Sequence, residues 1–488
     1  CEAMYGQDGV RREPRVTVAN VAQNDGAPLS ADDVLLVTGG GKGIGFETAF
    51  HLAQDSGARL ILLGRSKDDD ELRTNINRLA AAKLRFDYVV ADVTKPLPRF
   101  DGVTAILHAA GTNAPALLDA LDENSFRAAV SPKLVGLRNV LGAVDPHALK
   151  LVITLGSVIA RTGMRGEAHY AFANEWLARK TEEFGAAHPQ CRAICIEWSV
   201  WSGMGMGERL GTMDALRRQG ITPIAPDEAV KLTMQLASAP PASHVMACGR
   251  LGDPPTIRYA DDPPPLYRFL EQPRVVVPGV ELVCDSEVSL RNDPYLEDHA
   301  FKGEPLLPAV MGLEAMSQVA RMLSGEAPSR IDNVELLQPV TLATMRVASL
   351  RSGDRVDVAV RSSSTQFKLD HFRARVTVGP RPERPRIDLP IGEVDLDPVD
   401  DLYGPLLFHT GRFRGVTRYR VLTATHCVAE IAPHADSLFH RYLPAHLLLG
   451  DATIRDAAIH ALQACVPQAT VLPQGIGSVE LFAPVEGP

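Results

Sequence analysis

The sequence lacks an excess of basic residues and lacks any long apolar run. Its 488 residues carry 50 Lys and Arg against 59 Asp and Glu, which gives a net charge of −9 and a pI near 5.9. This balance argues against a nucleic-acid or anionic-membrane partner. No apolar run reaches the ~18 residues that a membrane helix needs, and no signal peptide is recognisable. We therefore expect a cytoplasmic protein that binds neither nucleic acid nor membrane.

Clustered cysteines are also missing. No CxxC or Cys/His cluster is present, so no metal site is expected. An odd, scattered set of thiols fits a reducing compartment, and two of them flank an expected strand start and should be buried. The chain begins with Cys1 rather than Met, which indicates a piece of a longer polypeptide. The seven residues are Cys1, Cys191, Cys195, Cys248, Cys284, Cys427 and Cys465.

A chain of this length should fold as at least two domains. Residues 1–30 are polar and non-periodic, and we interpret them as an upstream linker. Short apolar runs then alternate with helical stretches, which predicts a doubly wound parallel α/β sheet over residues 31–255. The expected strands are 34–37, 60–63, 86–91, 103–107, 151–155, 192–198 and 244–247.

A glycine-rich turn joins the first strand to a helix. Glycines let the backbone approach a pyrophosphate, and the helix start supplies N–H groups and a positive dipole. A glycine motif alone is weak evidence for a binding site, but its position between a strand and a helix favours dinucleotide binding. The residues assigned to this turn are Thr38, Gly39, Gly40, Gly43, Ile44 and Gly45.

Three later strand ends complete the expected cofactor site. Arg65 stands where an acidic residue would bind the 2′-hydroxyl of NAD, and it can instead hold a 2′-phosphate, which favours NADPH. The alternative is a solvated surface arginine. The third strand ends at Asp92 and Val93, and the fourth runs into small residues against which the cofactor can lie. These small residues are Ala109, Ala110 and Gly111.

Polar residues follow the fifth strand. Ser157 comes at its end, and Tyr170 and Asn174 lie one helical turn apart on a common face. Two interpretations are open: a helix start with incidental polar residues, or a set that delivers a proton to a carbonyl.

Residues 33–255 together resemble the short-chain dehydrogenase/reductase family. That family normally has Lys four residues after the Tyr, and this chain has Asn174 there. The resemblance then implies that the lysine is Lys133, an exchange typical of polyketide synthase ketoreductase domains. The stretch Thr112–Pro115 lacks the Leu-Asp-Asp fingerprint of one alcohol configuration, and Thr162 replaces the Trp of the other, so the configuration stays open. The structural subdomain of that family is missing, apart from residues 1–30.

The second half begins after a Pro- and Asp-rich stretch, residues 256–274, which we interpret as a linker. His299 precedes a glycine turn and a long apolar helix over 309–323, and it is either a structural histidine or a base facing a pocket. Asp456 and His460 are four residues apart and share a helix face. Strand-like runs around two apolar helices predict two sheets, each wrapped on a helix.

Residues 275–488 resemble the double-hotdog dehydratase domain of polyketide and fatty-acid synthases. His299, Gly303 and Pro308 match its catalytic-histidine motif, Tyr403-Gly404-Pro405 matches its YGP motif, and Asp456 with His460 matches its Asp-x-x-x-Gln/His motif. Asp451-Ala452 stands where that family has His-Pro. The second hotdog is expected to be incomplete at the C-terminus. The overall fold class is thus α/β plus α+β, a Rossmann-type sheet followed by a double hotdog, and the iterative enediyne-type synthases are most similar.

The resemblance implies roles for these residues and partners for the chain. NADPH would reduce a β-ketoacyl thioester carried on the phosphopantetheine arm of an acyl carrier protein. Tyr170 would donate the proton, Ser157 would bind the carbonyl oxygen, Lys133 would lower the pKa of Tyr170, and Asn174 would support the relay. The chain would work with ketosynthase, acyltransferase and carrier domains, as a homodimer in the full synthase.

The resemblance also implies a base–acid pair for loss of water from the resulting β-hydroxyacyl thioester. His299 would be the base, and the amide of Gly303 at the helix start would polarise the thioester. Asp456 would be the acid, with a pKa raised by its apolar neighbours Ala457, Ala458 and Ile459, and Tyr403 and His460 would support the site.

Two alternatives remain. A multifunctional β-oxidation enzyme also joins a short-chain dehydrogenase to a hotdog hydratase, but it should use NAD and keep Tyr-x-x-x-Lys, so Arg65 and Asn174 count against it. A non-catalytic module that docks an acyl carrier should have lost its catalytic residues, and both sets are present.

Overall fold

The chain divides into two compact units, Cys1–Ala260 and Asp261–Pro488, in a computed structural model. The structure describes residues 3–19, 21, 28–205, 213–218, 220–239, 242–252, 254, 256–260, 265–388, 392–433, 439–441 and 447–483. Parts of both predicted linkers, including residues 261–264, lie outside these ranges. Within them, no helix combines the length and apolar character needed to cross a membrane.

The first unit is built on a seven-stranded parallel sheet of order β5-β4-β3-β6-β7-β8-β9. Its central strands are continuous apolar runs because both faces of the sheet are covered, as the sequence predicts. The strands are β3 (Val34–Thr38), β4 (Arg59–Gly64), β5 (Phe86–Val90), β6 (Ala105–His108), β7 (Leu151–Ser157), β8 (Arg192–Trp198) and β9 (His244–Ala247).

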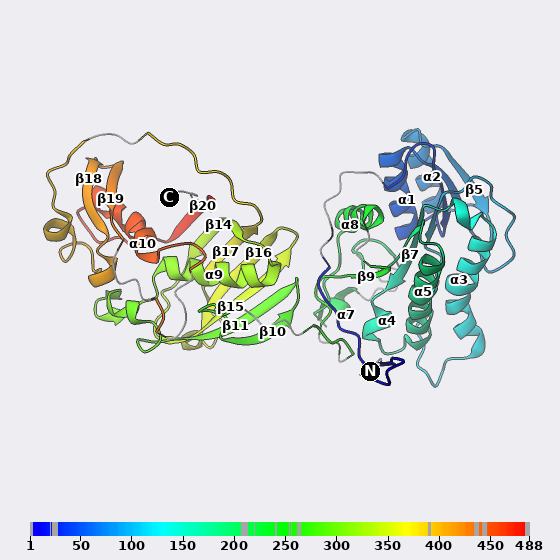
Figure 1. Ribbon diagram of the computed structural model, residues 1–488, viewed down its shortest axis with the longest axis horizontal. Coiled ribbons are helices and arrows are strands. Elements are labelled where there is room, and N and C mark those ends of the chain that lie inside the picture. The colour runs from blue at the N-terminus through cyan, green and yellow to red at the C-terminus, as the bar shows by residue number, and fades with distance from the viewer. Residues whose placement is uncertain are drawn as a thin grey trace. The chain divides into compact units, whose positions relative to one another are not determined.

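Helices cover both faces of this sheet (Figure 1). On one face lie α1 (Gly43–Ser56), α2 (Asp70–Ala81) and α8 (Pro226–Ser238). On the other lie α3 (Glu123–Gly142) and α5 (Ala168–Ala187), which pack side by side. Two short helices, α4 (Ile159–Thr162) and α7 (Met213–Arg218), are also found among the described residues of this unit. This is the predicted doubly wound α/β architecture.

The strand order reverses between β3 and β6, which are hydrogen-bonded neighbours. The chain builds β4 and β5 on one side of β3 and then crosses to β6 on the other. Loops at the carboxyl ends of β3 and β6 therefore diverge and leave a crevice, the usual ligand position in open α/β sheets.

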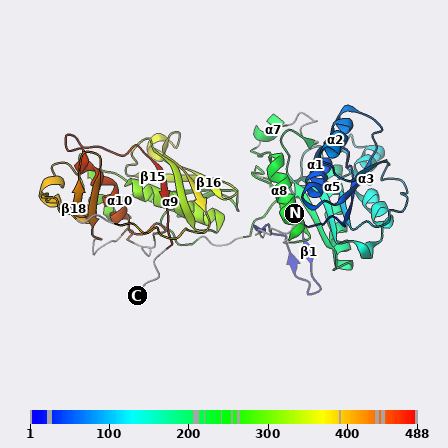
Figure 2. The ribbon, with the colours of Figure 1, turned by 90° about the horizontal axis from the view of Figure 1, so that it is seen from above.

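The N-terminal stretch has more structure than a linker. It forms a hairpin of β1 (Met4–Tyr5) and β2 (Arg11–Arg12), which Figure 2 shows beside the first unit. Val16 then forms a parallel bridge with Tyr259, at the end of the same unit.

The second unit contains a seven-stranded antiparallel sheet of order β10-β11-β15-β16-β17-β14-β20. The apolar helix α9 (Ala309–Ser324) lies against it, and contacts β11, β14, β15, β16 and β17 (Figure 1). The strands are β10 (Gln272–Val277), β11 (Glu281–Val288), β14 (Pro328–Leu336), β15 (Ala343–Ser352), β16 (Arg355–Ser362), β17 (Asp370–Val378) and β20 (Gly475–Glu480). This sheet with its central helix is the predicted hotdog arrangement.

A smaller layer carries the second predicted helix. Here α10 (Ala452–His460) packs near β18 (Val416–Leu422) and β19 (Cys427–Ile431), which pair in a two-stranded antiparallel sheet. Within the described residues, the second sheet is thus much smaller than the first. A short hairpin, β12 (Ala300–Phe301) and β13 (Glu304–Pro305), directly follows His299.

Candidate active sites

A cavity of about 460 Å³ opens in the first unit beside the point where the strand order reverses. Its walls come from the glycine turn after β3, the end of β4, the loop after β6, the end of β7 and the start of α5. These segments lie far apart in the sequence and meet because parallel strands present their carboxyl ends at one edge of the sheet.

The glycine turn presses closely against the loop after β6. Gly39 has a φ of +64°, and a Cβ added there would lie 3.0 Å from the carbonyl oxygen of Ala109. A Cβ on Gly45 would lie 2.7 Å from the Cβ of Ala109. Larger side chains would force the two loops apart. The turn can therefore supply the close backbone approach that a dinucleotide pyrophosphate needs.

A buried hydrogen-bond chain connects this turn to α3. The hydroxyl oxygen of Thr38 accepts from the N–H groups of Ala109 and Ala110, at 3.2 and 3.1 Å, so its own proton points to Nδ1 of His108, at 2.8 Å. Nε2 of His108 then donates to the carbonyl oxygen of Lys133, at 3.0 Å. Burial lowers the pKa of His108 to about 3, so this imidazole is neutral.

Four predicted catalytic side chains gather at the same end of the sheet. Ser157 ends β7, Tyr170 lies in the first turn of α5, and Lys133 reaches in from α3; all three line the cavity. Nζ of Lys133 lies 5.8 Å from the centroid of the Tyr170 ring. Asn174 is fully buried and donates from Nδ2 to the backbone oxygen of Tyr170, at 2.8 Å.

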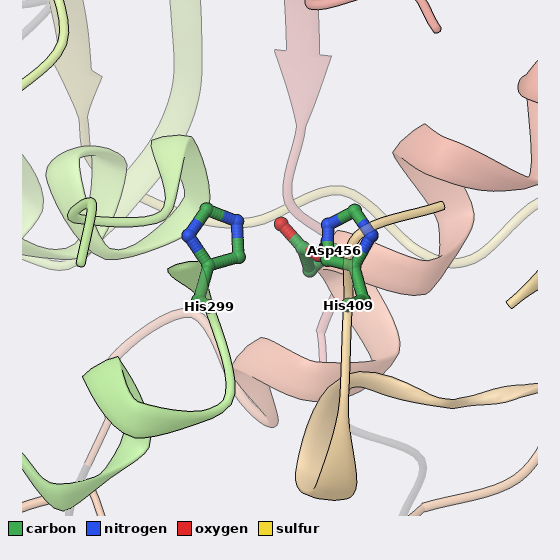
Figure 3. Close-up of side chains that lie close together, drawn as sticks. All are labelled: His299, His409 and Asp456. Atoms are coloured by element: carbon green, nitrogen blue, oxygen red, sulfur yellow. Dashed lines mark ion pairs between the residues drawn. The ribbon is translucent and has the colours of Figure 1, made fainter. Parts of the chain in front are cut away.

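The second unit brings together two imidazoles and a carboxylate. Figure 3 shows His299, which precedes β12, facing His409, with an oxygen of Asp456 from α10 between the two rings. One nitrogen of each imidazole and one oxygen of the carboxylate lie within 4.8 Å of one another, and all three residues are buried. Such a set can hold a divalent cation, but Asp456 Oδ2 already lies 3.2 Å from Nε2 of His409, which favours proton transfer.

Asp456 is the centre of this cluster. Its Oδ2 also lies 3.2 Å from Nδ1 of His460, and Nε2 of His460 lies 3.0 Å from the hydroxyl of Tyr403. Burial acts to raise the pKa of Asp456, but hydrogen bonds from His409 and His460 outweigh it, so the pKa lies well below its ordinary value. The carboxylate is ionised at neutral pH.

Family comparisons agree with both sites. Residues 34–203 match the KR domain family, and residues 270–363 match the polyketide synthase dehydratase domain. The chain thus carries a KR domain followed by the N-terminal part of a polyketide synthase dehydratase domain. The second match includes His299 and ends before Tyr403, His409 and Asp456, so the roles of these three depend on geometry.

Curated relatives of the two domains are type I polyketide synthases and similar assemblies. Polyketide synthase PksM of Bacillus subtilis is 26% identical over 240 residues, 47% of this chain and 6% of that protein. One chain of the polyunsaturated fatty acid synthase of a Thraustochytrium species is 23% identical over an alignment that covers 97% of this chain and 19% of that protein. The present chain thus spans no more than about a fifth of the length of these two relatives. The enediyne-type subgroup stays a prediction.

Solved ketoreductases are similar to the first domain. An A1-type ketoreductase is 25% identical, with a TM-score of 0.45, over 52% of this chain and 54% of that one. The N-terminal ketoreductase of the macrolactin assembly line is 22% identical, with a TM-score of 0.39, over 49% of this chain and 47% of that one.

The cavity of the ketoreductase domain collects only some of the predicted cofactor residues. Five of them are described but do not line it: Thr38, Gly40, Asp92, Val93 and Ala110. A Cβ added at Gly40, for example, would meet the side chains of Val37 and Leu62. The predicted residues that line it are Gly39, Gly43, Ile44, Gly45, Arg65, Ala109 and Gly111.

The electrostatics of Tyr170 differ from the expectation. A nearby cation is expected to lower its pKa, but burial raises the pKa to about 12, and only the hydrogen bond with Asn174 acts against it. Burial also lowers the pKa of Lys133 itself to about 8. Both groups are held in an environment that disfavours charge.

Sequence reasoning missed several polar residues that line this cavity. Glu167 lies one turn before Tyr170 and is 5% exposed; one carboxyl oxygen accepts from Asn113 at 3.1 Å, and the other has no described partner. Glu167 and Tyr170 are three residues apart and so share a helix face, and this spacing is the signal by which the sequence could have identified Glu167. Buried polar atoms without a described partner also belong to Trp198, Ser199 and Trp201.

Two expectations for the dehydratase domain are wrong, and one residue was missed. The pKa of Asp456 is lowered, not raised, because imidazoles rather than Ala457, Ala458 and Ile459 face its carboxylate. Gly303 is not at a helix start: it occupies the exposed β12–β13 turn with a φ of +85°, and α9 begins at Ala309. His409 was not predicted at all.

Proposed function

We propose that residues 31–255 reduce a β-ketoacyl thioester with NADPH and that residues 275–488 dehydrate the β-hydroxyacyl product to the α,β-enoyl thioester. The observation that carries the first step is the convergence of Ser157, Tyr170 and Lys133 on a cavity whose other wall is the glycine turn. The second step is supported by the cluster of His299, His409 and Asp456.

The ketoreductase cavity fits a dinucleotide. Gly39 and Gly45 let the glycine turn pack on the loop after β6, where a Cβ would collide with Ala109. Trp198 and Ser199, which line the cavity, carry buried polar atoms with no described partner. The glycine turn would hold the pyrophosphate, and Arg65, exposed at the end of β4, would hold the 2′-phosphate. NADPH, when bound, supplies the hydride for reduction.

Side chains that line the cavity would then bind and protonate the carbonyl oxygen. Tyr170, with a pKa of about 12, carries its proton at neutral pH and can release it to an alkoxide of higher basicity. The hydroxyl of Ser157 would donate a hydrogen bond to the same oxygen. Lys133 and Asn174 would orient Tyr170, Lys133 from its anchor on the backbone of β7 and Asn174 by its bond to the backbone of Tyr170.

His299 has the geometry of a base in the dehydratase domain. Its Nδ1–H donates to the carbonyl oxygen of Leu306, at 2.8 Å, which leaves the lone pair on Nε2. Burial lowers its pKa, so the imidazole is neutral and able to take the α-proton. Tyr403 and His460 would hold Asp456 in place. The proton for the leaving hydroxyl would come from a group in the cluster around Asp456.

The substrate would be an acyl chain on the phosphopantetheine arm of an acyl carrier protein. Ketosynthase and acyltransferase domains of the same synthase would be the other partners, and the assembly would be a homodimer. A β-oxidation-type enzyme that runs in reverse is the second candidate, but Arg65 at the end of β4 favours the phosphorylated cofactor.

A direct assay tests both activities on the chain. With a 3-oxobutyryl N-acetylcysteamine thioester, NADPH should be consumed faster than NADH, and both 3-hydroxy and enoyl products should form. Tyr170→Phe should stop reduction while a supplied 3-hydroxyacyl thioester is still dehydrated. Equal use of NADH, or no product with either cofactor, would contradict the proposal.

A further inference from the structure

The hydrogen bonds around Asp456 determine which nitrogen atoms carry protons. The hydroxyl oxygen of Tyr403 accepts from the N–H of Val416, at 2.9 Å, so its proton points to Nε2 of His460, at 3.0 Å. Nδ1–H of His460 then donates to Oδ2 of Asp456, at 3.2 Å. Both nitrogens of His460 are thereby engaged, and this imidazole can give no proton to a substrate without breaking the chain.

His409 has one nitrogen to spare. Its Nε2 lies 3.2 Å from the same Oδ2 of Asp456, while its Nδ1 is buried and has no partner among the described residues. The ring is held by stacking on Phe408, with centroids 4.1 Å apart, and by His460, at 4.2 Å. A carboxylate that orients one nitrogen and leaves the other free is the arrangement of a general acid–base histidine.

The second free nitrogen belongs to His299. Its Nδ1 is bonded to Leu306, so Nε2 is available, and the ring centroids of His299 and His409 are 5.1 Å apart. Loss of water from a β-hydroxyacyl thioester needs one proton acceptor at Cα and one proton donor at the β-oxygen. The cluster supplies two available nitrogens for these two tasks.

We propose that His409, not Asp456, gives the proton to the leaving hydroxyl; this inference depends on the proposed dehydratase function. His299 Nε2 takes the α-proton as the Cα–H bond breaks, and the electron pair forms the Cα–Cβ double bond. The Cβ–O bond breaks, and the oxygen takes the proton from Nδ1 of the His409 imidazolium and leaves as water. His299 then returns its proton to solvent and His409 regains one, so atoms and charge balance over the cycle.

The role of Asp456 follows from its two imidazole donors. As an ionised carboxylate it stabilises the imidazolium form of His409 and orients Nδ1, but it holds no proton to donate. Burial lowers the pKa of His409, and the hydrogen bond and charge of Asp456 oppose this. The resting imidazole is therefore mostly neutral, and the imidazolium that donates is a minor form and a stronger acid than a free histidine. A strong acid is what a poor leaving group such as hydroxide requires.

A substrate with a different leaving group can separate the role of the acid from the role of the base. Chloride leaves without a proton, so a 3-chlorobutyryl thioester needs only the base, whereas the 3-hydroxybutyryl thioester needs both. His409→Ala should lower dehydration on the order of 10²–10⁴-fold and leave elimination of chloride near the wild-type rate. His299→Ala should lose both reactions, and His426→Ala, a variant of an exposed histidine, should lose neither.

Other outcomes have definite meanings. Restoration of dehydration in His409→Ala by added imidazole would support the proposal, because a structural role is not replaced by a free base. Wild-type dehydration in both His409→Ala and His409→Asn would overturn it, as would equal loss of the two reactions in these variants. Loss of wild-type dehydration after EDTA treatment would also overturn it. A wild-type chain without dehydration would instead contradict the proposed function.

Discussion

Nζ of Lys133 donates a hydrogen bond to the carbonyl oxygen of Leu155, 2.9 Å away. Leu155 lies two residues before Ser157 in β7. This bond fixes a side chain of α3 to the strand that carries the catalytic serine. Lys133 is 3% exposed, and burial lowers its pKa to about 8. The lysine is therefore held in the cavity wall in a charge state that is sensitive near neutral pH.

Replacement of this lysine should remove ketoreduction and spare the fold. Lys133→Met keeps the length and apolar stem but loses the ammonium, so reduction of a 3-oxoacyl thioester should fall on the order of 10²–10³-fold. Lys180→Met, which removes an exposed lysine paired with Glu183, is the matched control and should keep its rate. Turnover near wild type in Lys133→Met would mean that another cation serves Tyr170, with Lys42 the next candidate in the cavity.

Cofactor preference should depend on Arg65. This residue follows β4, lines the cavity and lies close enough to Asp92 to help lower the pKa of that carboxyl, whose main cause is its bond to Thr94. Arg65→Asp should weaken NADPH far more than NADH, because the phosphate loses a cation and meets a like charge. Arg59→Asp, at the other end of the same strand, should change neither affinity. Binding titrations with both cofactors measure the two affinities. If the ratio of NADPH to NADH affinity is unchanged in Arg65→Asp, Arg65 does not bind the 2′-phosphate.

Local sequence patterns predict the first unit well because its elements are local. Most strands of the parallel sheet are short, mainly apolar segments, so 244–247 and 192–198 are found at the bounds that the structure has. Ser157, Tyr170 and Asn174 belong to one strand–loop–helix segment, and their spacing brings them together. The hairpin at Met4–Tyr5 and Arg11–Arg12 escapes this reasoning because each strand has only two residues.

The second site depends on contacts that no local pattern contains. His409 lies in a loop before β18 and reaches Asp456 only through the fold, so no spacing connects them. Ala457 follows Asp456 in the sequence, but its side chain packs into an apolar cluster with Val416 and Tyr419. The carboxylate of Asp456 is instead faced by His460 and His409. An apolar sequence neighbourhood therefore predicts the wrong direction for the pKa of Asp456.

The two activities should separate by mutation. His299→Ala removes the base, and Asp456→Asn removes the charge that holds two imidazoles, so each should abolish dehydration of a 3-hydroxyacyl thioester. NADPH-dependent reduction should continue in both, and the 3-hydroxyacyl product should accumulate, as product analysis by mass spectrometry would show. Dehydration at the wild-type rate in either variant would contradict its role. Collapse of ketoreduction in a folded variant would contradict the division between residues 31–255 and 275–488.

The stability of the ketoreductase domain should depend on pH through His108. This side chain is 1% exposed, is hydrogen-bonded to Thr38 and Lys133, and has a pKa of about 3, lowered chiefly by burial. The unfolded chain takes up a proton near pH 6.5, where the folded chain does not. Stability is therefore complete above about pH 6.5 and is lost as the pH falls toward about 3, with roughly 2 kcal/mol lost between pH 7 and pH 5.

Urea unfolding of the full chain can measure this effect because all three tryptophans, Trp176, Trp198 and Trp201, lie in the first unit. Tryptophan fluorescence thus reports only on that unit. His108→Gln should be less stable at pH 7, since it alters a buried hydrogen-bond chain, but its free energy of unfolding should change less between pH 7 and pH 5. His147→Gln, a variant of an exposed histidine, should keep the wild-type dependence. If His108→Gln retains the full wild-type slope, another buried group must bind the proton on unfolding.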